Sequence, residues 1–532
     1  MQARVAVLGA GTMGAGIAQV ALQAGFGVVL YDLAEVGLER ARLQIAQNFG
    51  RLVSKARLSA DAAADMLTRL ELSTALHSVK DVELVIEAAP EVLEIKRDLF
   101  RFLDAQLPES VLLASNTSSL SITAIASGLN HRHRVLGMHF FNPAPVMKLV
   151  EVVRARETGD EAMAQAQQWV AKFGKTAVVV QDTPGFLVNR IARPYYGEAL
   201  KMMGDHALAP ALVDAVMTQV AGFKMGPFTL MDLIGIDVNF AVTCSVYEAS
   251  FHEPRFRPHP IQAQLVAARH LGRKSGRGFY DEVVADTTQA RGLSPSGSPL
   301  TIAWFETTGV WAAGFLAALR AAGHRVQVLD GGIGGDRLLD FTGTDCVIDL
   351  NDEPTGLTHL LENGCVPPDT WCLVATTCIT ATAWQSRWSR LFARVNTWFD
   401  WHEHGTVEVG VAAGASRVSL EARLASLGAG LRQRLLMVPD VPGLVSQRVL
   451  SMIVNEACWV IQQGVADENA VEEAMRLGAN YPQGPLAWGD RIGAARIVAL
   501  LDTLIQQEGD RYRAAPRLRQ HALAQLFLLQ PV

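Results

Sequence analysis

The chain has 532 residues, of which 49% are hydrophobic and 19% are charged, and this composition is typical of well-packed globular domains. It is too long for a single core, so we expect two to four domains. The formal net charge is -6, from 47 basic and 53 acidic side chains, and we therefore expect no nucleic-acid partner.

Three further features bear on the cellular location. A predicted strand at 4–9 (RVAVLG) follows the first residue almost directly, so we expect no signal or transit peptide. No run of about 18 apolar residues occurs, so we expect no membrane span. The six cysteines have no CxxC spacing, which favours buried thiols in a reducing cytoplasm and no metal site.

The first 120 residues predict an α/β fold with a parallel sheet. Residues 4–32 read as strand, glycine turn, helix and strand, with GAGTMGAG as the turn. A long helical stretch follows at roughly 35–69. The apolar runs 82–89 (VELVIEAA) and 111–116 (VLLASN) are bounded by turn or polar residues, as buried parallel strands are.

From about Asp182 the pattern turns helical, and a polar, turn-rich stretch at 286–299 indicates a linker. Beyond it the sequence repeats itself. The segment 182–190 (DTPGFLVNR) recurs at 440–448 (DVPGLVSQR), an offset of 258. The same offset relates Gly226-Pro227, Asp232 and Gly235 to Gly484-Pro485, Asp490 and Gly493, so we expect a duplicated helical domain.

The first strand–helix–strand unit also has an echo, at 301–330. There Gly11, Gly25 and Asp32 align with Gly309, Gly323 and Asp330, but Thr307 and Ala312 replace two other glycines. A side chain at the tight turn keeps the backbone from approaching a pyrophosphate closely. We expect residues 300–405 to form a Rossmann-like domain that has lost its cofactor.

The glycine turn at 9–14 predicts a dinucleotide site. The motif Gly9-x-Gly11-x-x-Gly14 follows a strand and opens a helix, and Asp32 ends the next strand. The glycines let backbone N–H groups meet a pyrophosphate, while Asp32 accepts hydrogen bonds from the adenine ribose. Leu33 stands where an NADP enzyme places an arginine, so NAD is favoured. The candidate cofactor-binding residues here are Gly9, Gly11, Met13, Gly14 and Asp32.

Several motifs together resemble the L-3-hydroxyacyl-CoA dehydrogenase family. They are SNTSSL at 115–120, HFFNP at 139–143, KLVEV at 148–152, DTPGFLVNR at 182–190, GPFTLMDLIG at 226–235 and GRKSGRGFYD at 272–281. The resemblance covers about the first 285 residues. The longer layout, with a degenerate second half, is similar to the bacterial 3-hydroxyacyl-CoA dehydrogenases of phenylacetate breakdown, which include 3-hydroxyadipyl-CoA and 3-hydroxybutyryl-CoA dehydrogenases.

The reaction that this resemblance implies needs a base. A hydroxyl proton must be removed while a hydride leaves the same carbon, and a neutral imidazole, with an unperturbed pKa of about 6.5, suits this task. His139 is the candidate. The resemblance implies that Glu151 holds its other ring nitrogen, although spacing alone does not place the two in contact.

The resemblance also implies further site residues. Ser118 and Asn189 match positions that contact the substrate oxygen, where donors stabilise developing negative charge; a turn or cap role is the structural alternative. Asn48, which stands where the family has serine, and Lys55 match positions that bind the CoA nucleotide. With Arg51 and Arg57 nearby, a solvated helix face is the alternative. The positions matching the nicotinamide half of the cofactor site are Glu91, Lys96, Asn116, Asn142 and Lys274.

The second half is not expected to repeat the chemistry. VEV recurs at 407–409, but no HFFNP precedes it, and Gln447 replaces Asn189. We therefore expect one active site per chain. The expected domains are an NAD-binding Rossmann domain at 1–181, a helical domain at 182–285, the linker at 286–299, a degenerate Rossmann-like domain at 300–405 and a second helical domain at 406–532 whose core repeat starts at 438.

The resulting prediction is an NAD-dependent oxidation of a (S)-3-hydroxyacyl-CoA in the cytoplasm. A dehydrogenase of a non-CoA hydroxy acid, of the L-gulonate type, and a non-catalytic structural relative are the alternatives. A dicarboxylic substrate would need a cation in the acyl pocket, for which Arg190, Arg193 and Lys201 are candidates. Since shorter family members form a two-fold dimer through the helical domain, the duplicated copy suggests either a homodimer or an intramolecular pseudo-dimer.

Overall fold

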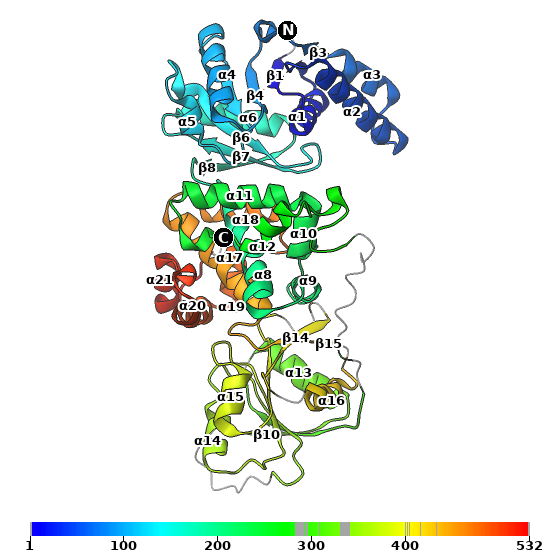
Figure 1. Cartoon of the computed structure of the whole chain (residues 1–532), viewed down its shortest axis with the longest axis vertical. Coiled ribbons are helices and arrows are strands. Elements are labelled where there is room, and N and C mark those ends of the chain that lie inside the picture. The colour runs from blue at the N-terminus through cyan, green and yellow to red at the C-terminus, as the bar shows by residue number, and fades with distance from the viewer. Residues whose placement is uncertain are drawn as a thin grey trace. The chain divides into compact units, whose positions relative to one another are not determined.

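The computed structural model describes residues 3–281, 293, 296–307, 309–329, 341–399, 401, 403, 405–414, 417–431 and 433–529 (Figure 1). Most of the expected linker at 286–299, and Asp330, lie outside the described residues. The chain divides into two compact units. The first comprises Met1–Ile191, Glu248–Phe251 and Val460–Gly484, and the second comprises Ala192–Tyr247, His252–Trp459 and Pro485–Val532.

The first unit contains a sheet of eight strands in the order β3-β2-β1-β4-β5-β6-β7-β8. Every neighbouring pair is parallel except β6 and β7, which are antiparallel. This is the doubly wound α/β fold that the sequence predicts. The strands are β1 (Arg4–Leu8), β2 (Gly27–Tyr31), β3 (Leu70–Ser73), β4 (Leu84–Glu87), β5 (Leu112–Ser115), β6 (Val135–Phe140), β7 (Leu149–Arg154) and β8 (Thr176–Gln181).

The helices of this unit differ from the expectation in one place. The helical stretch predicted at roughly 35–69 is present and consists of two helices, because the chain turns after residue 54 and Ala56 adopts a left-handed φ of 53°. One continuous apolar core joins α1, α2 and α6 to alternate residues of the strands. The helices are α1 (Thr12–Gln23), α2 (Glu35–Ser54), α3 (Ala60–Thr68), α4 (Leu93–Gln106), α5 (Ile122–Ala126), α6 (Asp160–Lys172), α7 (Val188–Ile191) and α18 (Glu468–Gly478).

The second unit holds a sheet of seven strands in the order β10-β9-β11-β12-β13-β14-β15. This order repeats that of the first sheet, again with one antiparallel pair, β13 and β14. The expected domain boundary between 405 and 406 is wrong, because β14 and β15 complete this sheet by pairing with β13. The strands are β9 (Thr301–Phe305), β10 (Arg325–Leu329), β11 (Cys346–Asp349), β12 (Trp371–Val374), β13 (Phe392–Val395), β14 (Thr406–Val411) and β15 (Arg434–Pro439).

The helices of the second unit include pairs that are related by the offset of the sequence repeat. The pair α10 and α19 begins 258 residues apart, and so does the pair α11 and α20. The helices are α8 (Arg193–His206), α9 (Pro210–Gln219), α10 (Pro227–Ile234), α11 (Ile236–Ala249), α12 (Pro260–Ala267), α13 (Val310–Ala321), α14 (Thr355–Glu362), α15 (Ala381–Trp388), α16 (Arg417–Gly428), α17 (Val445–Gln462), α19 (Pro485–Ile492), α20 (Ala494–Glu508) and α21 (Pro516–Ala524).

Matching contacts support the duplication. Asp232 accepts backbone hydrogen bonds from Phe279 and Tyr280, at 2.9 and 3.0 Å. Asp490, 258 residues later, accepts the same kind of pair from Leu528 and Leu529, at 2.5 and 3.0 Å. The two aspartates therefore tie the same two parts of each helical copy together.

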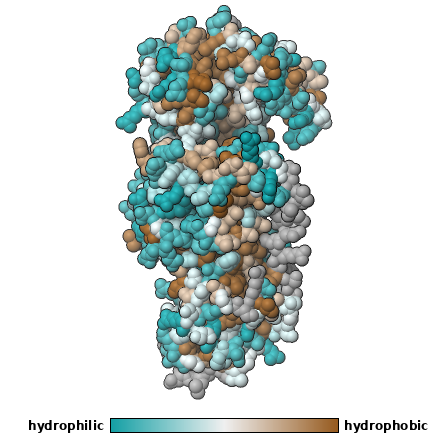
Figure 2. Space-filling view, viewed as in Figure 1, coloured by the Kyte–Doolittle hydropathy of each residue, from teal (hydrophilic) through white to brown (hydrophobic). Residues whose placement is uncertain are grey.

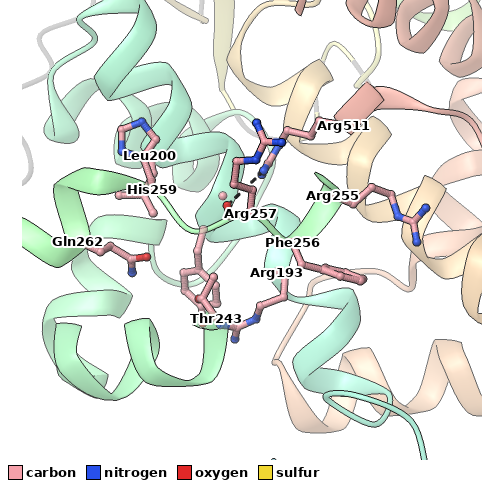
Figure 3. Close-up of a pocket in the computed structure, with 11 residues that line it drawn as sticks. Arg193, Leu200, Thr243, Arg255, Phe256, Arg257, His259, Gln262 and Arg511 are labelled. Atoms are coloured by element: carbon pink, nitrogen blue, oxygen red, sulfur yellow. Dashed lines mark hydrogen bonds between the residues drawn. The ribbon is translucent and has the colours of Figure 1, made fainter. Parts of the chain in front are cut away.

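Buried ion pairs join the two helical copies within the second unit. Glu198, fully buried on α8, accepts hydrogen bonds from Arg511 Nε at 2.9 Å and from the Tyr512 hydroxyl at 3.0 Å. Figure 3 shows Arg511 reaching the backbone of Arg257, beside a cavity of about 10 Å³, which has room for about one water molecule. Removing one partner of such a buried pair would leave an uncompensated charge, so these contacts hold the copies in one arrangement.

Hydrophilic and hydrophobic side chains are interspersed on the face in Figure 2. Within the described residues no single helix meets the length and hydropathy of a membrane span, and α10 with α11 meets them only as a pair bent by 101°. The expectation of buried thiols is wrong for Cys365, which is exposed, whereas Cys346, Cys372 and Cys458 are buried.

Candidate active site

The glycine turn after β1 is shaped for a close backbone approach. Gly9 has φ of 104°, and a Cβ there would lie 2.5 Å from the Ala88 carbonyl oxygen. A Cβ on Gly14 would overlap the carbonyl oxygen of Gly9, so this glycine lets α1 pack on the turn. A Cβ on Gly11 would meet no atom within 4 Å. Packing therefore explains Gly9 and Gly14, whereas the open space at Gly11 fits the approach of a pyrophosphate.

Asp32 lies beside this turn, directly after β2. Its Oδ2 accepts a hydrogen bond from Ala10 N at 2.7 Å, and its Oδ1 accepts one from Ala34 N at 3.0 Å. The carboxylate thus supports the turn as well as presenting negative charge next to it. Leu33, which follows, is 84% exposed and brings no cation to the site. This donor and acceptor set fits the ribose and pyrophosphate of NAD.

We expect Gly11→Val to separate cofactor binding from folding. Its backbone is extended, with φ of -70° and ψ of -175°, so a β-branched residue is accommodated without strain. The melting temperature should stay at the wild-type value, while NADH affinity, measured by fluorescence titration, should fall at least about tenfold. Gly14→Ala is the contrasting variant and should lower the melting temperature. Wild-type NADH affinity in Gly11→Val would contradict this use of the open space.

A buried ion pair organises the strand ends next to the turn. Glu87 ends β4 with no exposure, and its Oε1 accepts a hydrogen bond from Lys96 Nζ at 2.6 Å. Its Oε2 accepts one from the Ser115 hydroxyl at 2.5 Å. Glu87 was not predicted as a site residue, although a carboxylate inside an apolar strand was a usable signal. Lys96 is 1% exposed, so its ammonium is not a solvated surface charge.

Glu91 connects this pair to the loop after β5. Its Oε2 lies 3.2 Å from Lys96 Nζ, and its Oε1 accepts hydrogen bonds from the Thr117 hydroxyl at 2.6 Å and Ser118 N at 3.1 Å. Burial by itself would raise the pKa of Glu91, but the Lys96 ammonium and these hydrogen bonds, with those from Ser119, hold it below the usual value. The ionised Glu91 therefore fixes the loop that carries Ser118.

His139 and Glu151 are direct partners in the antiparallel pairing of β6 and β7. His139 Nδ1 lies 2.6 Å from Glu151 Oε2. The second carboxylate oxygen of Glu151 accepts hydrogen bonds from Leu187 N and Val188 N, at 3.1 and 2.8 Å. Glu151 is fully buried, while His139 is 6% exposed. The hairpin thus brings together the two residues that spacing alone did not.

Two aromatic rings lie next to the imidazole of His139. The ring centroids of Phe141 and Phe186 lie 4.6 and 5.8 Å from that of His139. With Nδ1 on the carboxylate, Nε2 is the nitrogen that remains for a ligand, and no hydrogen bond to it occurs among residues 3–281 and the other described residues. The fixed Nδ1–H···carboxylate contact favours the tautomer whose Nε2 accepts a proton.

The remaining candidates from the first unit lie around this hairpin. Asn116 Oδ1 accepts a hydrogen bond from Phe140 N at 2.8 Å, which fixes the end of β6. Asn142 is exposed in the next loop, and Lys175 holds that loop through the carbonyls of Ala144 and Met147, at 2.7 and 2.6 Å. Burial lowers the pKa of Lys175. Lys175 was not predicted, because no local pattern marks a lysine that bonds to backbone carbonyls.

Asp182 links the segment that carries Asn189 to the part of the chain that directly follows the Ser118 motif. Asp182 Oδ2 accepts hydrogen bonds from the Ser121 hydroxyl at 2.7 Å and from Thr123 N at 2.8 Å. Asn189 lies in α7, one residue after the Val188 amide that bonds to Glu151. The segment 182–190 is therefore tied both to the loop after β5 and to the histidine's carboxylate.

The other predicted residues lie elsewhere on the described chain. On α2, Asn48 Nδ2 donates to Gln19 Oε1 at 2.9 Å, and Lys55 is exposed just past the last turn. Met13 is half-buried in the first turn of α1. Lys274 belongs to the second unit, where its Nζ lies 2.5 Å from Asp237 Oδ1.

The second sheet contains a relic of the histidine–glutamate pair. Glu408 on β14 is fully buried, and Val445 N donates to its Oε1 at 2.7 Å, as the Val188 segment does to Glu151. Asn396 faces it in place of histidine, with Nδ2 3.0 Å from Glu408 Oε2. The Ser446 hydroxyl donates to the same oxygen at 2.5 Å. Burial raises the pKa of Glu408. The carboxylate has persisted, but the amide of Asn396 stands where the first sheet has an imidazole.

Comparisons with known proteins define the family. The family model for the 3-hydroxyacyl-CoA dehydrogenase NAD-binding domain matches residues 4–183. The model for the C-terminal domain of the same family matches twice, at 185–282 and at 443–527. Together with the doubly wound sheet, these matches make the chain an NAD-dependent oxidoreductase. It belongs to the 3-hydroxyacyl-CoA dehydrogenase family.

Relatives extend the likeness to the whole chain. The chain is 39% identical over 523 residues to 3-hydroxyadipyl-CoA dehydrogenase of Escherichia coli K12, covering 98% of this chain and 97% of that protein. A probable 3-hydroxybutyryl-CoA dehydrogenase of Bacillus subtilis is 40% identical over 282 residues, covering 52% of this chain and 96% of the relative. The second half is thus present in one relative and absent from the other.

A solved structure has the same architecture throughout. The crystal structure of 3-hydroxybutyryl-CoA dehydrogenase from Escherichia coli K12 superposes with a TM-score of 0.82 and 38% identity, covering 98% of this chain and 99% of the other. The names of the relatives agree on a 3-hydroxyacyl-CoA and differ in the acyl group. The chain is therefore an NAD-dependent 3-hydroxyacyl-CoA dehydrogenase.

Proposed function

We propose that His139 is the general base that removes the proton of the substrate's 3-hydroxyl. The observation that carries this proposal is the 2.6 Å contact between His139 Nδ1 and the buried Glu151 carboxylate. The contact orients the ring and leaves Nε2 to accept the proton. Glu151, held by two backbone amides, then stabilises the imidazolium, because a buried carboxylate 2.6 Å away offsets the new charge.

Ser118 and Asn189 would donate hydrogen bonds to the substrate oxygen as it becomes a carbonyl. Both are half-buried on segments fixed by the Glu91 and Asp182 contacts. NAD, when bound, supplies the hydride acceptor, and the glycine turn with Asp32 would hold its pyrophosphate and ribose. Glu91, Lys96, Asn116 and Asn142 surround the other half of that site in our proposal.

For the CoA moiety, Asn48 and Lys55 are the proposed contacts. Asn48 and Arg51 fall on one side of α2, since residues three apart share a helix face, and Lys55 follows directly after its last residue. The exposed ammonium of Lys55 can pair with a CoA phosphate. The cytoplasmic location stays a prediction.

The three cations that were candidates for binding a dicarboxylic acyl group already have partners in the structure, and this bears on which acyl group we propose. Arg190 is 5% exposed and donates to Gln463 Oε1 at 2.7 Å, and Arg193 is 6% exposed and donates to Thr243 at 3.0 Å. Lys201 lies 3.1 Å from Glu508. A distal carboxylate would have to compete with these partners, so we propose a short, uncharged acyl chain such as 3-hydroxybutyryl-CoA.

A substrate panel tests this proposal. Purified protein with NAD should produce NADH from (S)-3-hydroxybutyryl-CoA with a higher kcat/KM than from 3-hydroxyadipyl-CoA. The reverse order would assign the dicarboxylic substrate. Absence of NADH formation from every 3-hydroxyacyl-CoA would refute the proposed roles of the site residues.

We further propose that the second half acts as an intramolecular counterpart of a dimer partner. Helix α18, from the second helical copy, packs within the first unit against β7, β8 and α7. The carbonyl of Val465 accepts a hydrogen bond from Gln181 N at 2.9 Å. A Cβ on Gly478 would lie 2.6 Å from Leu149 and 3.0 Å from Val188. Leu149 lies two residues before Glu151 on β7, and Val188 is one of the two amide donors to Glu151, so α18 supports the catalytic pair.

Substituting Gly478 tests this support. Gly478→Phe should displace Leu149 and Val188 and lower kcat at least about tenfold, because catalytic geometry tolerates little displacement. NADH affinity should stay unchanged, since the glycine turn is untouched. Arg476→Phe, on the exposed side of the same helix, is the matched control and should keep wild-type kcat. A folded Gly478→Phe protein with wild-type kcat would refute the positioning role of α18.

A further inference from the structure

A cluster of three charged side chains lies at the carboxyl end of β4. It consists of Glu87, Glu91 and Lys96, and Lys96 Nζ lies 2.6 Å from Glu87 Oε1 and 3.2 Å from Glu91 Oε2. The side chains of Glu87 and Lys96 are 0% and 1% exposed, while that of Glu91 is 38% exposed. We call these three residues the charge cluster. Because water screens buried charges poorly, the cluster acts strongly on a ligand bound next to it.

The hydrogen bonds of the charge cluster fix its protonation state. An ammonium has three donors, and those of Lys96 have three acceptors: Glu87 Oε1, Glu91 Oε2 and the carbonyl oxygen of Ala89 at 3.2 Å. Glu87 also accepts hydrogen bonds from Ala89 N at 2.6 Å and from the Ser115 hydroxyl at 2.5 Å, so its partners are donors, as an ionised carboxylate requires. Burial tends to raise the pKa of Glu91, but Lys96 and the hydrogen bonds to this carboxylate lower it, so Glu91 is ionised as well. The cluster therefore carries one excess negative charge.

The N-terminus of α4 lies next to the cluster and does not cancel this charge. Helix α4 begins at Leu93, two residues after Glu91. A helix N-terminus is equivalent to a charge of roughly +0.5. The cluster and the helix end together thus remain negative.

The order of the strands places the cluster along the path of the cofactor. Asp32 follows β2, the glycine turn follows β1, the cluster lies at the end of β4, and His139 is on β6. In the sheet the order is β2-β1-β4-β5-β6. A dinucleotide with its ribose at Asp32 and its pyrophosphate at the glycine turn therefore extends across β4 to bring its nicotinamide to His139. This placement rests on the proposed function, and it puts the cluster beside the nicotinamide half.

The second half keeps a carboxylate at the matching position but not the lysine. Asp349 ends β11 as Glu87 ends β4, 262 residues earlier, and both are fully buried. At the same offset Thr358 stands in place of Lys96. The backbone and the side chain of Asn351 donate to Asp349 Oδ1 at 3.1 and 2.8 Å. The fold therefore accommodates a carboxylate here without an ammonium, and this points to a role of the charge cluster in the half that holds the cofactor.

We propose that the excess negative charge of the cluster makes the site favour the oxidised cofactor over the reduced one, and that Glu87 sets this preference. The nicotinamide ring is positively charged in NAD⁺ and neutral in NADH. During turnover the substrate carbon gives a hydride to the ring and the hydroxyl gives its proton to His139, so the ring loses its positive charge. A fixed negative charge beside the ring stabilises the NAD⁺ complex and not the NADH complex. Without Glu87, the ammonium of Lys96 would cancel the charge of Glu91.

The test is the ratio of the dissociation constants of NAD⁺ and NADH, Kd(NAD⁺)/Kd(NADH). Both constants are measured by calorimetric titration of the full-length protein without acyl-CoA. Glu87→Gln brings the cluster to zero net charge, so the ratio should rise about tenfold. Lys96→Met leaves two negative charges, so the ratio should fall about tenfold. Opposite changes identify the charge as the cause, because a structural defect would weaken the binding of both forms alike.

Three control variants keep the net charge of the cluster. Glu87→Asp retains the carboxylate, and the double variant of Glu87→Gln with Lys96→Met removes one charge of each sign. Glu94→Gln makes the same acid-to-amide change at an exposed position of α4, where solvent screens the charge. In all three the ratio should stay within about twofold of the wild-type value. A tenfold rise in Glu87→Asp would show that the shape of the side chain, and not its charge, sets the preference.

A wild-type ratio in both Glu87→Gln and Lys96→Met would overturn the inference, and so would a change in the same direction in both. Should Glu87→Gln fail to fold, Glu91→Gln makes the same charge change at a partly exposed position. A rise of the ratio in that variant supports the proposal, and a wild-type ratio refutes it. The titrations contain no substrate, so their failure would leave the role of His139 as the base intact.

Discussion

His139→Asn should lower kcat by about 10²- to 10⁴-fold, the range that general-base catalysis contributes. The substitution removes the nitrogen that accepts the substrate proton but retains an N–H donor for Glu151. The second sheet shows that this pairing is compatible with the fold, because Asn396 Nδ2 lies 3.0 Å from Glu408 there. The melting temperature should therefore change little. Steady-state kinetics with 3-hydroxybutyryl-CoA give the effect on turnover.

The control for His139→Asn is cofactor binding. The glycine turn and Asp32 do not contact His139 through any hydrogen bond of the described residues, so NADH affinity should equal that of the wild type. A folded His139→Asn enzyme with wild-type kcat would exclude His139 as the base. A loss of NADH affinity in proportion to kcat would indicate a role in cofactor binding.

Glu151→Gln and Glu408→Gln form a matched pair of substitutions. Both carboxylates are fully buried, and both accept backbone amides from the segment that starts the helical copy. We expect each variant to lose about 1–3 kcal/mol of unfolding free energy, because an amide satisfies fewer of these donors. Only Glu151→Gln should lower kcat, by roughly 10²- to 10⁴-fold, since a neutral amide does not stabilise the imidazolium.

Chemical denaturation and initial-rate kinetics on both variants distinguish the two effects. Equal losses of stability with unequal losses of kcat would separate the catalytic role of Glu151 from its structural role. A comparable loss of kcat in Glu408→Gln would show that the second half contributes to turnover more directly than we propose. An active Glu151→Gln enzyme would refute the imidazolium-stabilising role.

The predicted elements were most accurate where local pattern and fold agree. The glycine turn, Asp32 and the apolar strands were placed correctly, because a buried parallel strand is recognisable from its own residues. The helical stretch at 35–69 was recognised, but its division into two helices was not, since composition does not reveal a left-handed residue such as Ala56. The boundary at 405 was wrong, because only pairing with β13 shows that β14 and β15 belong to the sheet.

For the site, too, the sequence predicted individual residues but not the contacts between them. His139 and Glu151 were identified from motifs, but their contact arises from the antiparallel register of β6 and β7. Glu87, Lys175 and Asp182 were not identified, because each acts through partners distant in the chain. The relic pair was also missed: the VEV at 407–409 was recognised, but Asn396 has no sequence feature that links it to His139.

The sequence by itself determined the family, the NAD site and the duplication, because these depend on residues close together in the chain and on a constant offset of 258. Only the tertiary structure decided that α18 packs against β7 and β8 and that Glu151 is held by two amides. It also showed that the second sheet retains the buried carboxylate of Glu408, with Asn396 in place of the histidine. Such contacts join residues far apart in the chain, such as Leu149 and Gly478, and their free energy depends on burial and geometry that no local pattern encodes.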